Sequence, residues 1–472
     1  MRSILIAVPL ALGAISPAWA QKTPPQSTSG TAAKLHVPYE KYQLPNGLEV
    51  ILHEDHRLPV VAVDVWYHVG AFHEPPGRSG FAHLFEHMMF QGSQHVADDQ
   101  HIALLERIGA NDINGSTNFY RTNYFETVPS NHLETALWLE SDRMGFLPAA
   151  ITPASLNTQR EVVKNERRQR IETAPYGMAE EALWQTLFPE PHPYHGFGIG
   201  SMKDLDAATL DDVKEFFRTW YAPSNATLAI AGDFDPAQAK KLVEKYFGTL
   251  PSRPEPKPQE VAPVKLTREL VIRHDEEVAA LPGVFLSWHS PALFAEGDAE
   301  ADVLASILTY GKSSRLHRRL VREKQLAESV SANQQSLNAQ SVFEIEAVVA
   351  PGKDPAAVQK EIDAVLDDIR RKGVSADEVK RARNRIETGF VAGLQAVGGA
   401  GGKADLLQAY NHFFGEPDGF ARDLARYEAV TPEKVQTFVN EYLSPTARVV
   451  AIATPKPGKR QAPSAAAPEV KR

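Results

Sequence analysis

The chain of 472 residues carries 50 basic and 59 acidic side chains, a formal net charge of −9, and 43% hydrophobic residues. It contains no cysteine, which excludes disulfides and thiolate metal ligands. No basic stripe indicates a nucleic-acid partner, and the hydrophobic content is sufficient for large buried cores.

The first twenty residues have the pattern of an export signal. Arg2 is the basic start, residues 4–15 form a short apolar run, and Ala18–Ala20 fits a cleavage site. The apolar run is too short to cross a membrane. We therefore predict a signal peptide over 1–20 and a periplasmic protein without a membrane span, with secretion further out as the alternative. Residues 21–34, rich in Gln, Pro, Ser and Thr, are expected to form a disordered leader.

A first domain is predicted over residues 35–250. It opens with two apolar strands, at 48–52 and 60–69. A helix follows, for which Ser79 is the expected N-cap and Gly92 the expected end.

Residues 83–87 of this helix read His-Leu-Phe-Glu-His. His83 and His87 are four positions apart and therefore share a helical face, where two imidazoles can bind one metal ion. Zinc favours such nitrogen ligands together with an open position for water. Glu86 lies beside them, where a carboxylate can take a proton from that water. The spacing indicates a metallohydrolase.

A third metal ligand is expected in the charged helical run 159–168, because a catalytic zinc usually has three protein ligands. Glu166 shares a helical stripe with two valines and should face inward, whereas Glu161 points to the opposite side. An inward carboxylate needs a partner, so Glu166 is favoured over Glu161 as the ligand. An ion pair with Arg170, one turn on, is the alternative use of Glu166.

The metal motif and several other segments together resemble the M16 family of zinc peptidases, in which the motif is H-x-x-E-H. The other segments are Leu44–Leu48, Val69–Ala71, Asn114–Thr117 and Tyr221–Pro223. The resemblance implies that His83, His87 and Glu166 bind one zinc ion per subunit and that Glu86 is the general base. Glu166 follows His87 by 79 positions, which fits the family better than the 74 positions of Glu161.

Two further parts of the site are implied by the resemblance. Asn114, Gly115, Ser116 and Thr117 match the family's edge strand, which binds substrate backbone by β-augmentation. A simple turn is the alternative, because Asn-Gly is a strong turn signal. Gln159 stands where the family often has Glu; its amide can hydrogen-bond the site but supplies no charge.

The second half of the chain repeats the first. Residues 209–231 align without gaps to 431–453, and six apolar or turn positions are identical in the two segments. We predict a Pro-rich linker over 251–263, a second domain without the metal motif over 264–455, and a mobile tail over 456–472. The expected fold class is α+β: two homologous α/β sandwich domains, each a largely antiparallel sheet with helices packed on it, forming half of a clamshell in the family's terms.

The resemblance also suggests a partner chain. The family commonly contacts substrate with an Arg and a Tyr from the half that faces the zinc, whereas this chain has Val321 and Glu328 at those places. Valine cannot donate a hydrogen bond, and a glutamate there would repel a developing oxyanion. We therefore expect a heterodimer with a homologous subunit that lacks the zinc motif and supplies the Arg/Tyr pair, in preference to a homodimer.

The sequence thus predicts a zinc endopeptidase for peptides or unfolded polypeptides, bound as an extended strand inside a chamber. The alternative is a non-catalytic assembly subunit, and a processing peptidase dedicated to one substrate is a third reading. Three other conspicuous segments are interpreted as structural: His53–His56 as a solvated turn, His192–His195 as a structural loop, and Gly398–Gly402 as a helix break or hinge.

Overall fold

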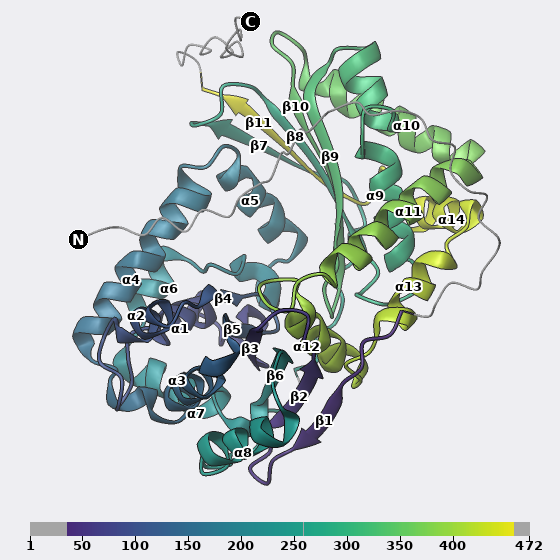
Figure 1. Ribbon diagram of the computed structural model, residues 1–472. Coiled ribbons are helices and arrows are strands. Elements are labelled where there is room, and N and C mark those ends of the chain that lie inside the picture. Colours follow the sequence, from purple (N-terminus) through teal and green to yellow (C-terminus); the bar gives the residue numbers. More distant parts are fainter. Residues whose placement is uncertain (1–34, 258, 457–472) are drawn as a thin grey trace, which may run out of the picture. The chain divides into compact units, whose positions relative to one another are not determined.

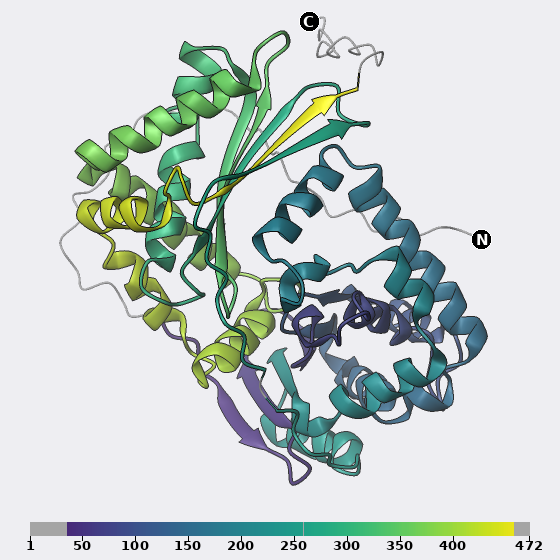
Figure 2. The same cartoon turned by 180° about the vertical axis from the view of Figure 1, so that it is seen from behind.

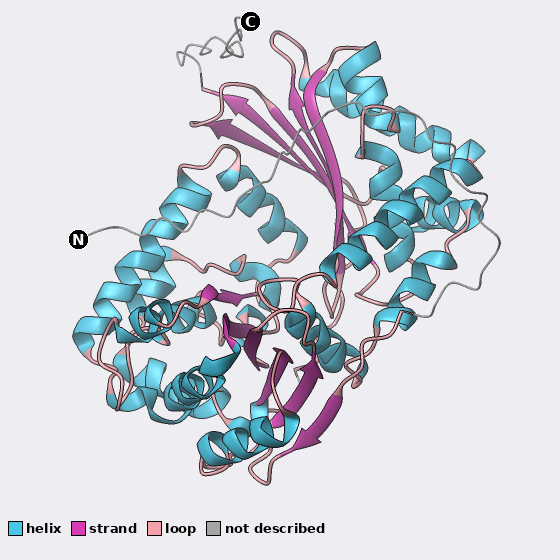
Figure 3. Ribbon diagram, viewed as in Figure 1, coloured by secondary structure: helices cyan, strands magenta, loops and turns pink. Residues whose placement is uncertain are grey.

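The computed structural model describes residues 35–257 and 259–456. The predicted signal peptide and leader, and the predicted tail from residue 457 on, lie outside these ranges. From His36 on, the described chain forms one compact unit that contains two mixed β-sheets with helices packed on them (Figures 1 and 3). Within the described ranges, no helix combines the length and the apolar character needed to cross a membrane.

The first sheet has six strands in the order β1-β2-β6-β3-β5-β4. Its neighbours are antiparallel except for the parallel pair β2 and β6. The strands are β1 (Glu40–Gln43), β2 (Glu49–Glu54), β3 (Val60–Tyr67), β4 (Asn111–Thr117), β5 (Thr122–Pro129) and β6 (Ala226–Gly232). Strand β4 therefore lies at one edge of the sheet.

The second sheet has five strands in the order β7-β11-β8-β10-β9, with β7 and β11 as its one parallel pair. The strands are β7 (Leu270–Glu276), β8 (Gly283–Ser290), β9 (Ala327–Gln335), β10 (Ser341–Val349) and β11 (Val449–Pro455). This order repeats that of the first sheet without β1. The prediction of two homologous, largely antiparallel α/β domains is therefore confirmed.

Helices cover both sheets. The first half contributes α1 (Phe81–Met88), α2 (Gln100–Arg107), α3 (Leu133–Phe146), α4 (Pro153–Arg167), α5 (Gly177–Leu187), α6 (Met202–Ala207), α7 (Leu210–Trp220) and α8 (Pro236–Phe247). The second half contributes α9 (Asp298–Thr309), α10 (Pro355–Lys372), α11 (Ala376–Gly393), α12 (Lys403–Phe414), α13 (Phe420–Glu428) and α14 (Pro432–Tyr442). Figures 1 and 2 show that α9, α10 and α14 gather on one side of the second sheet.

Each half lends one helix to the sheet of the other. Helix α12 lies on β2, β3 and β6 of the first sheet, where the Gln408 amide donates to the carbonyls of Asp64 (2.9 Å) and Thr227 (2.8 Å). Helix α5 lies on β7, β8 and β11 of the second sheet, and its Leu183 and Trp184 belong to an apolar cluster with Phe285. If the chain is divided at the linker, all strands of one sheet fall in the same half. Helix α12, however, then falls in the other half from the first sheet, and α5 in the other half from the second sheet.

Two of the segments interpreted as structural differ from expectation. His53 is not in a solvated turn: it is buried in β2, and its Nδ1 donates to the carbonyl of Pro38 (2.7 Å). Gly398–Gly402 lies between α11 and α12, as expected of a helix break, but Gly398 is not part of a free hinge, because a Cβ added there would come within 2.2 Å of Thr127 Oγ1 on the first sheet. Both positions are fixed by contacts between distant segments, which local sequence does not reveal.

Two imidazoles meet where α12 crosses the first sheet. His68 and His412 stack with centroids 4.9 Å apart, and their Nδ1 atoms are 3.1 Å apart, so one hydrogen is shared between them. Burial, followed by the nearby imidazoles of His412 and His73, lowers the pKa of His68 to about 3, and burial also lowers the pKa of His412. The pair is therefore stable in its neutral form.

This pair predicts a loss of stability in acid. Because its pKa is lowered in the folded state, His68 binds fewer protons when folded than when unfolded, so the free energy of unfolding falls as pH drops below about 6.5. For His68→Gln we expect the loss between pH 7 and pH 5, measured by urea unfolding, to be smaller by about 1–2 kcal/mol than in the wild type. An identical pH dependence in both proteins would contradict this assignment.

Candidate metal centre and active site

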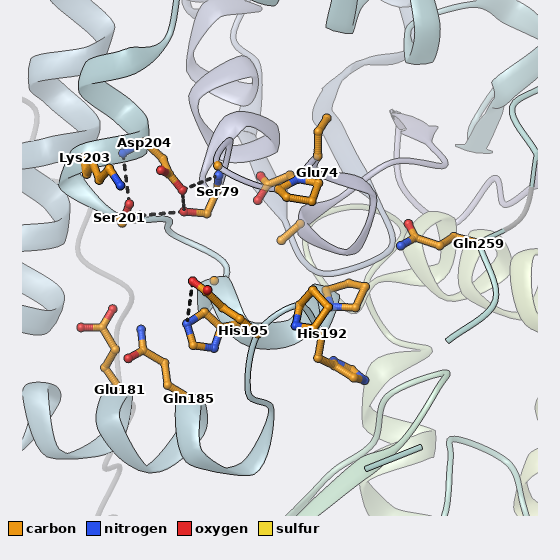
Figure 4. A pocket seen from close by; sticks show the side chains of 18 residues that line it. Glu74, Ser79, Glu181, Gln185, His192, His195, Ser201, Lys203, Asp204 and Gln259 are labelled. Carbon is orange, nitrogen blue, oxygen red and sulfur yellow. Dashed lines mark hydrogen bonds and ion pairs between the residues drawn. The ribbon is translucent and has the colours of Figure 1, made fainter. Parts of the chain in front are cut away.

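Helix α1 presents the His-Leu-Phe-Glu-His motif, but its N-terminus is not capped as expected. Ser79 Oγ donates to Asp204 Oδ2 (2.6 Å) in place of the helix, a contact drawn in Figure 4. The backbone N–H groups of Gly80 and Ala82 donate to the Glu74 carboxylate (2.9 and 2.8 Å). The helix ends at Met88, earlier than the expected Gly92. Burial raises the pKa of Glu74 to about 8.

Helix α4 brings Glu166 to the motif. Thr152 caps α4 through the backbone N–H of Ser155 (3.1 Å), and the helix runs to Arg167 before a π-helical turn. Of the two valines in the expected inward stripe, Val163 is fully buried but Val162 is exposed, and the Glu166 side chain is 25% exposed. Glu161 lies on the outer side and pairs with Lys164 (3.0 Å). The helical-face argument therefore distinguished the two glutamates as the structure does.

The three predicted ligand side chains converge. His83 Nε2 is 3.4 Å and His87 Nε2 is 3.6 Å from the oxygens of Glu166, and the two Nε2 atoms are 3.3 Å apart. Among the described residues, this is the one cluster of three His, Cys, Asp or Glu side chains with ligand atoms within 4.8 Å of one another. Two imidazole nitrogens and one carboxylate oxygen are a donor set that suits a catalytic zinc.

Two further observations fit a cation at this cluster. Glu166 Oε2 is buried and makes no hydrogen bond with any described residue, as expected of an atom reserved for a metal. Burial acts to raise the pKa of Glu166, but the nearby imidazoles of His83 and His87 outweigh it, so its pKa lies well below its ordinary range. The alternative partner, Arg170, is also in reach at 3.8 Å, but its side chain is 59% exposed and such a pair contributes little.

Glu86 lies against the edge strand. Its Oε2 accepts a hydrogen bond from Thr117 Oγ1 (2.6 Å). A Cβ added to Gly115 would lie 3.1 Å from Glu86 Cγ, so the strand backbone passes directly beside the carboxylate. The carboxylate is thus placed against strand β4.

The residues expected to bind substrate lie in strand β4, and the alternative of a simple turn is wrong. Asn114–Thr117 pair with Thr122–Phe125 of β5, and β4 has no strand on its other side among the described residues. Side chains alternate along a strand. Gly115 and Thr117 face α1, whereas Ser116 faces the other way and donates to Asn123 Oδ1 (2.8 Å).

Among the described residues, no hydrogen bond or ion pair joins Gln159, Val321 or Glu328 to the three predicted ligands. Gln159 is buried on α4, seven positions before Glu166, and no hydrogen bond within the described ranges joins it to the three ligands. Val321 lies in a π-helical segment, His317–Glu323, and Glu328 is exposed on β9, an edge strand of the second sheet. The roles predicted for these positions stay predictions.

A buried ion pair holds the helix that carries Glu166. Both terminal nitrogens of Arg167 donate to the two carboxylate oxygens of Glu181 on α5 (2.8 Å each), and one also donates to the carbonyl of Gly200 (2.9 Å). Both side chains are at least nine-tenths buried. Because α5 is seated on the second sheet, this pair fixes α4, and with it Glu166, relative to both sheets. Sequence reasoning missed it, since no local pattern links the two residues.

Glu181→Gln should weaken metal binding without touching a ligand. Breaking this buried pair is expected to cost about 3 kcal/mol of unfolding free energy, and the loosened α4 should lower zinc affinity by about tenfold. Urea unfolding of the zinc-free protein and competition with a chromophoric chelator measure the two effects. Glu190→Gln, at a side chain that is 84% exposed, is the control. Unchanged zinc affinity in Glu181→Gln would refute the link.

The pocket drawn in Figure 4 lies apart from this chemistry. It encloses about 470 Å³ between α5, the loop before α1 and the start of α6, and none of the predicted zinc ligands lines it. The segment His192–His195 forms one of its walls. Tyr194 is fully buried and its hydroxyl accepts from the backbone N–H of Ala339 (3.0 Å), which supports the structural interpretation of this segment.

Comparison with protein families gives two adjacent matches. Residues 49–193 match the model described as "Insulinase (Peptidase family M16)". Residues 207–386 match the model described as "Peptidase M16 inactive domain". The first match contains all three predicted metal ligands, and the second covers most of the half that lacks the motif.

Relatives and solved structures agree with these matches. The chain is 31% identical over 374 residues to the zinc protease PqqE of Helicobacter pylori, covering 78% of this chain and 83% of that protein. It is 24% identical to the zinc protease YmxG of Bacillus subtilis, covering 78% and 88%. A crystal structure of a protease from Helicobacter pylori superposes with a TM-score of 0.81 at 28% identity, covering 89% of this chain and all of that one. Pitrilysin superposes with a TM-score of 0.72 at 19% identity, covering 92% of this chain and 46% of that one.

Proposed function

Because the chain belongs to peptidase family M16, we propose that it is a zinc-dependent endopeptidase that cleaves peptides or unfolded polypeptides held as an extended strand. One observation carries the proposal: three ligand side chains converge beside a carboxylate that lies against a free strand edge. The proposed metal ligands, the proposed base and the proposed peptide-binding strand thus lie within one small region.

Different residues of the chain would bind the metal, transfer the proton and hold the peptide. His83, His87 and Glu166 would hold one zinc ion, which supplies a Lewis acid that polarises the scissile carbonyl and makes water more acidic. Glu86 takes the proton from the attacking water and can return it to the departing nitrogen. The edge of β4 binds the peptide main chain through backbone hydrogen bonds, which demand little of the substrate sequence.

We further propose that the working enzyme contains a second, homologous chain in the periplasm. The chain matches 46% of pitrilysin and 48% of the Escherichia coli protein PqqL, which is described as a periplasmic protease. A chain of half that length would complete a comparable enzyme by pairing. Val321 and Glu328 favour a partner that lacks the zinc motif and supplies an Arg/Tyr pair.

A non-catalytic assembly role is the second candidate. The match of residues 207–386 to a domain described as inactive favours it for that half of the chain. The converged ligands and the placement of Glu86 favour catalysis for the first half. A processing peptidase dedicated to one substrate would share this site and differ only in substrate range.

The test is a peptide-library digest with mass-spectrometric readout. The chain from residue 21 on is assayed alone and with a homologous chain of the same organism that lacks the zinc motif, with and without a chelator. We expect cleavage that requires both chains, that chelation abolishes and that zinc restores. Full cleavage by this chain alone would overturn the heterodimer, and a zinc-loaded complex that cleaves no peptide would overturn the proposed enzyme.

A further inference from the structure

We infer that Thr117 is a positioning residue that ties the base, Glu86, to the strand that holds the substrate. The inference rests on the proposed function and deepens it. In this arrangement, strand β4 presents the edge for peptide binding and also donates the hydrogen bond that orients the base. Glu86 is on α1, so the bond joins two separate elements.

The direction of the hydrogen bond follows from the neighbouring groups. Thr117 Oγ1 lies 2.6 Å from Glu86 Oε2 and 3.3 Å from Thr122 Oγ1. The Thr122 hydroxyl donates to the carbonyl of Val69 (2.9 Å), so its proton is already engaged. A carboxylate oxygen accepts hydrogen bonds. The Thr117 proton is therefore directed to Glu86, and the short distance is that of a charge-assisted bond.

Thr117 is held rigidly enough to act as a reference point. It is the last residue of β4 and pairs with Thr122, which is fully buried in β5. Its β-branched side chain has restricted rotation about χ1. Glutamate, in contrast, has three rotatable bonds, so without a fixed donor its carboxylate would sample several orientations. Gly115, two residues earlier on the same face, leaves the room that the Glu86 side chain occupies.

The arrangement couples substrate register to proton transfer. A peptide added to β4 has its scissile bond placed by its register along Asn114–Thr117, and Thr117, the last of these residues, also donates the hydrogen bond to the base. The positions of Glu86 and of the scissile peptide bond thus both depend on strand β4. General-base catalysis depends on such placement, and a misplacement of about 1 Å can cost about a hundredfold in rate.

The test compares Thr117→Val, which keeps the shape and loses the hydroxyl, with Thr117→Ser, which keeps the hydroxyl. The probe is an internally quenched peptide that the wild-type preparation cleaves. For Thr117→Val we expect kcat to fall by about tenfold to a hundredfold, with KM, zinc affinity and melting temperature near the wild-type values. Thr117→Ser should recover most of kcat. Because peptide binding uses the strand backbone, neither variant should change the affinity of an uncleaved peptide for the Glu86→Gln protein.

A second readout is independent of turnover. In crystal structures of the zinc-free variants, Glu86 should keep its bond to residue 117 in Thr117→Ser and should be displaced or split between rotamers in Thr117→Val. An unchanged kcat in Thr117→Val, or equal losses in both variants, would overturn the inference. A loss of zinc affinity that parallels kcat would also overturn it. If the wild type itself cleaves no peptide, the proposed function fails first, which distinguishes the two results.

Discussion

Replacing Glu86 by Gln should lower kcat for peptide cleavage by about 10²- to 10⁴-fold while bound zinc stays at one ion per chain. Glutamine has nearly the same shape and can still accept the hydrogen bond from Thr117, which is 2.6 Å from Glu86 Oε2. It cannot take a proton from water at neutral pH. The change therefore removes the base and leaves His83, His87 and Glu166 in place.

Steady-state kinetics and metal analysis by mass spectrometry measure the two quantities on the same preparation. The control is Glu106→Gln, which makes the same chemical change at an exposed position on α2 and should leave kcat unaffected. A Glu86→Gln protein that turns over within fivefold of the wild type would refute the assignment of Glu86. A protein that loses zinc would point to a ligand role.

Replacing Glu166 by Gln should reduce zinc affinity by more than about a hundredfold, beyond the range typical of residues that only support a ligand. The amide is neutral and binds zinc more weakly than the carboxylate, whose oxygens lie 3.4 and 3.6 Å from the two imidazoles. The two histidines would be left to hold the ion without a negative charge. Peptide cleavage should be lost in parallel and return in part at high zinc concentration.

Glu161→Gln is the matched control, five positions earlier on the same helix. Its side chain is 58% exposed and pairs with Lys164 at the surface, so zinc affinity should stay within twofold of the wild type. Chelator competition measures both variants. The reverse outcome, in which Glu161→Gln loses zinc and Glu166→Gln retains it, would mean that the wrong glutamate has been assigned.

The convergence of His83, His87 and Glu166 could be predicted because it depends on short-range patterns. His83 and His87 follow from a spacing of four on a helix, and Glu166 follows from the face that it shares with Val163. The edge position of Asn114–Thr117 needed the resemblance, since the local Asn-Gly signal fits a turn equally well. The duplication was visible because six apolar or turn positions recur at a constant distance.

The parts that sequence could not supply depend on contacts between distant segments. Glu74 accepts from the start of α1, the position where Ser79 looked like the natural cap. Arg167 and Glu181 meet only because α4 and α5 fold back on each other. Thr117 belonged to the predicted strand, but its bond to Glu86 required the distance between β4 and α1. In each case the partner was chosen by tertiary packing among several residues of equal local suitability.

The exchange of helices has a consequence for the order in which the protein is built. Synthesis proceeds from the N-terminus, and domains often fold as they emerge. The first sheet is complete in sequence at Gly232, yet α12, which covers part of it, begins only at Lys403. Its Gln408 must reach back to Asp64, a separation of 344 residues. Contacts of such range slow folding, so the metal-binding half would wait, incompletely covered, until almost the whole chain has been made.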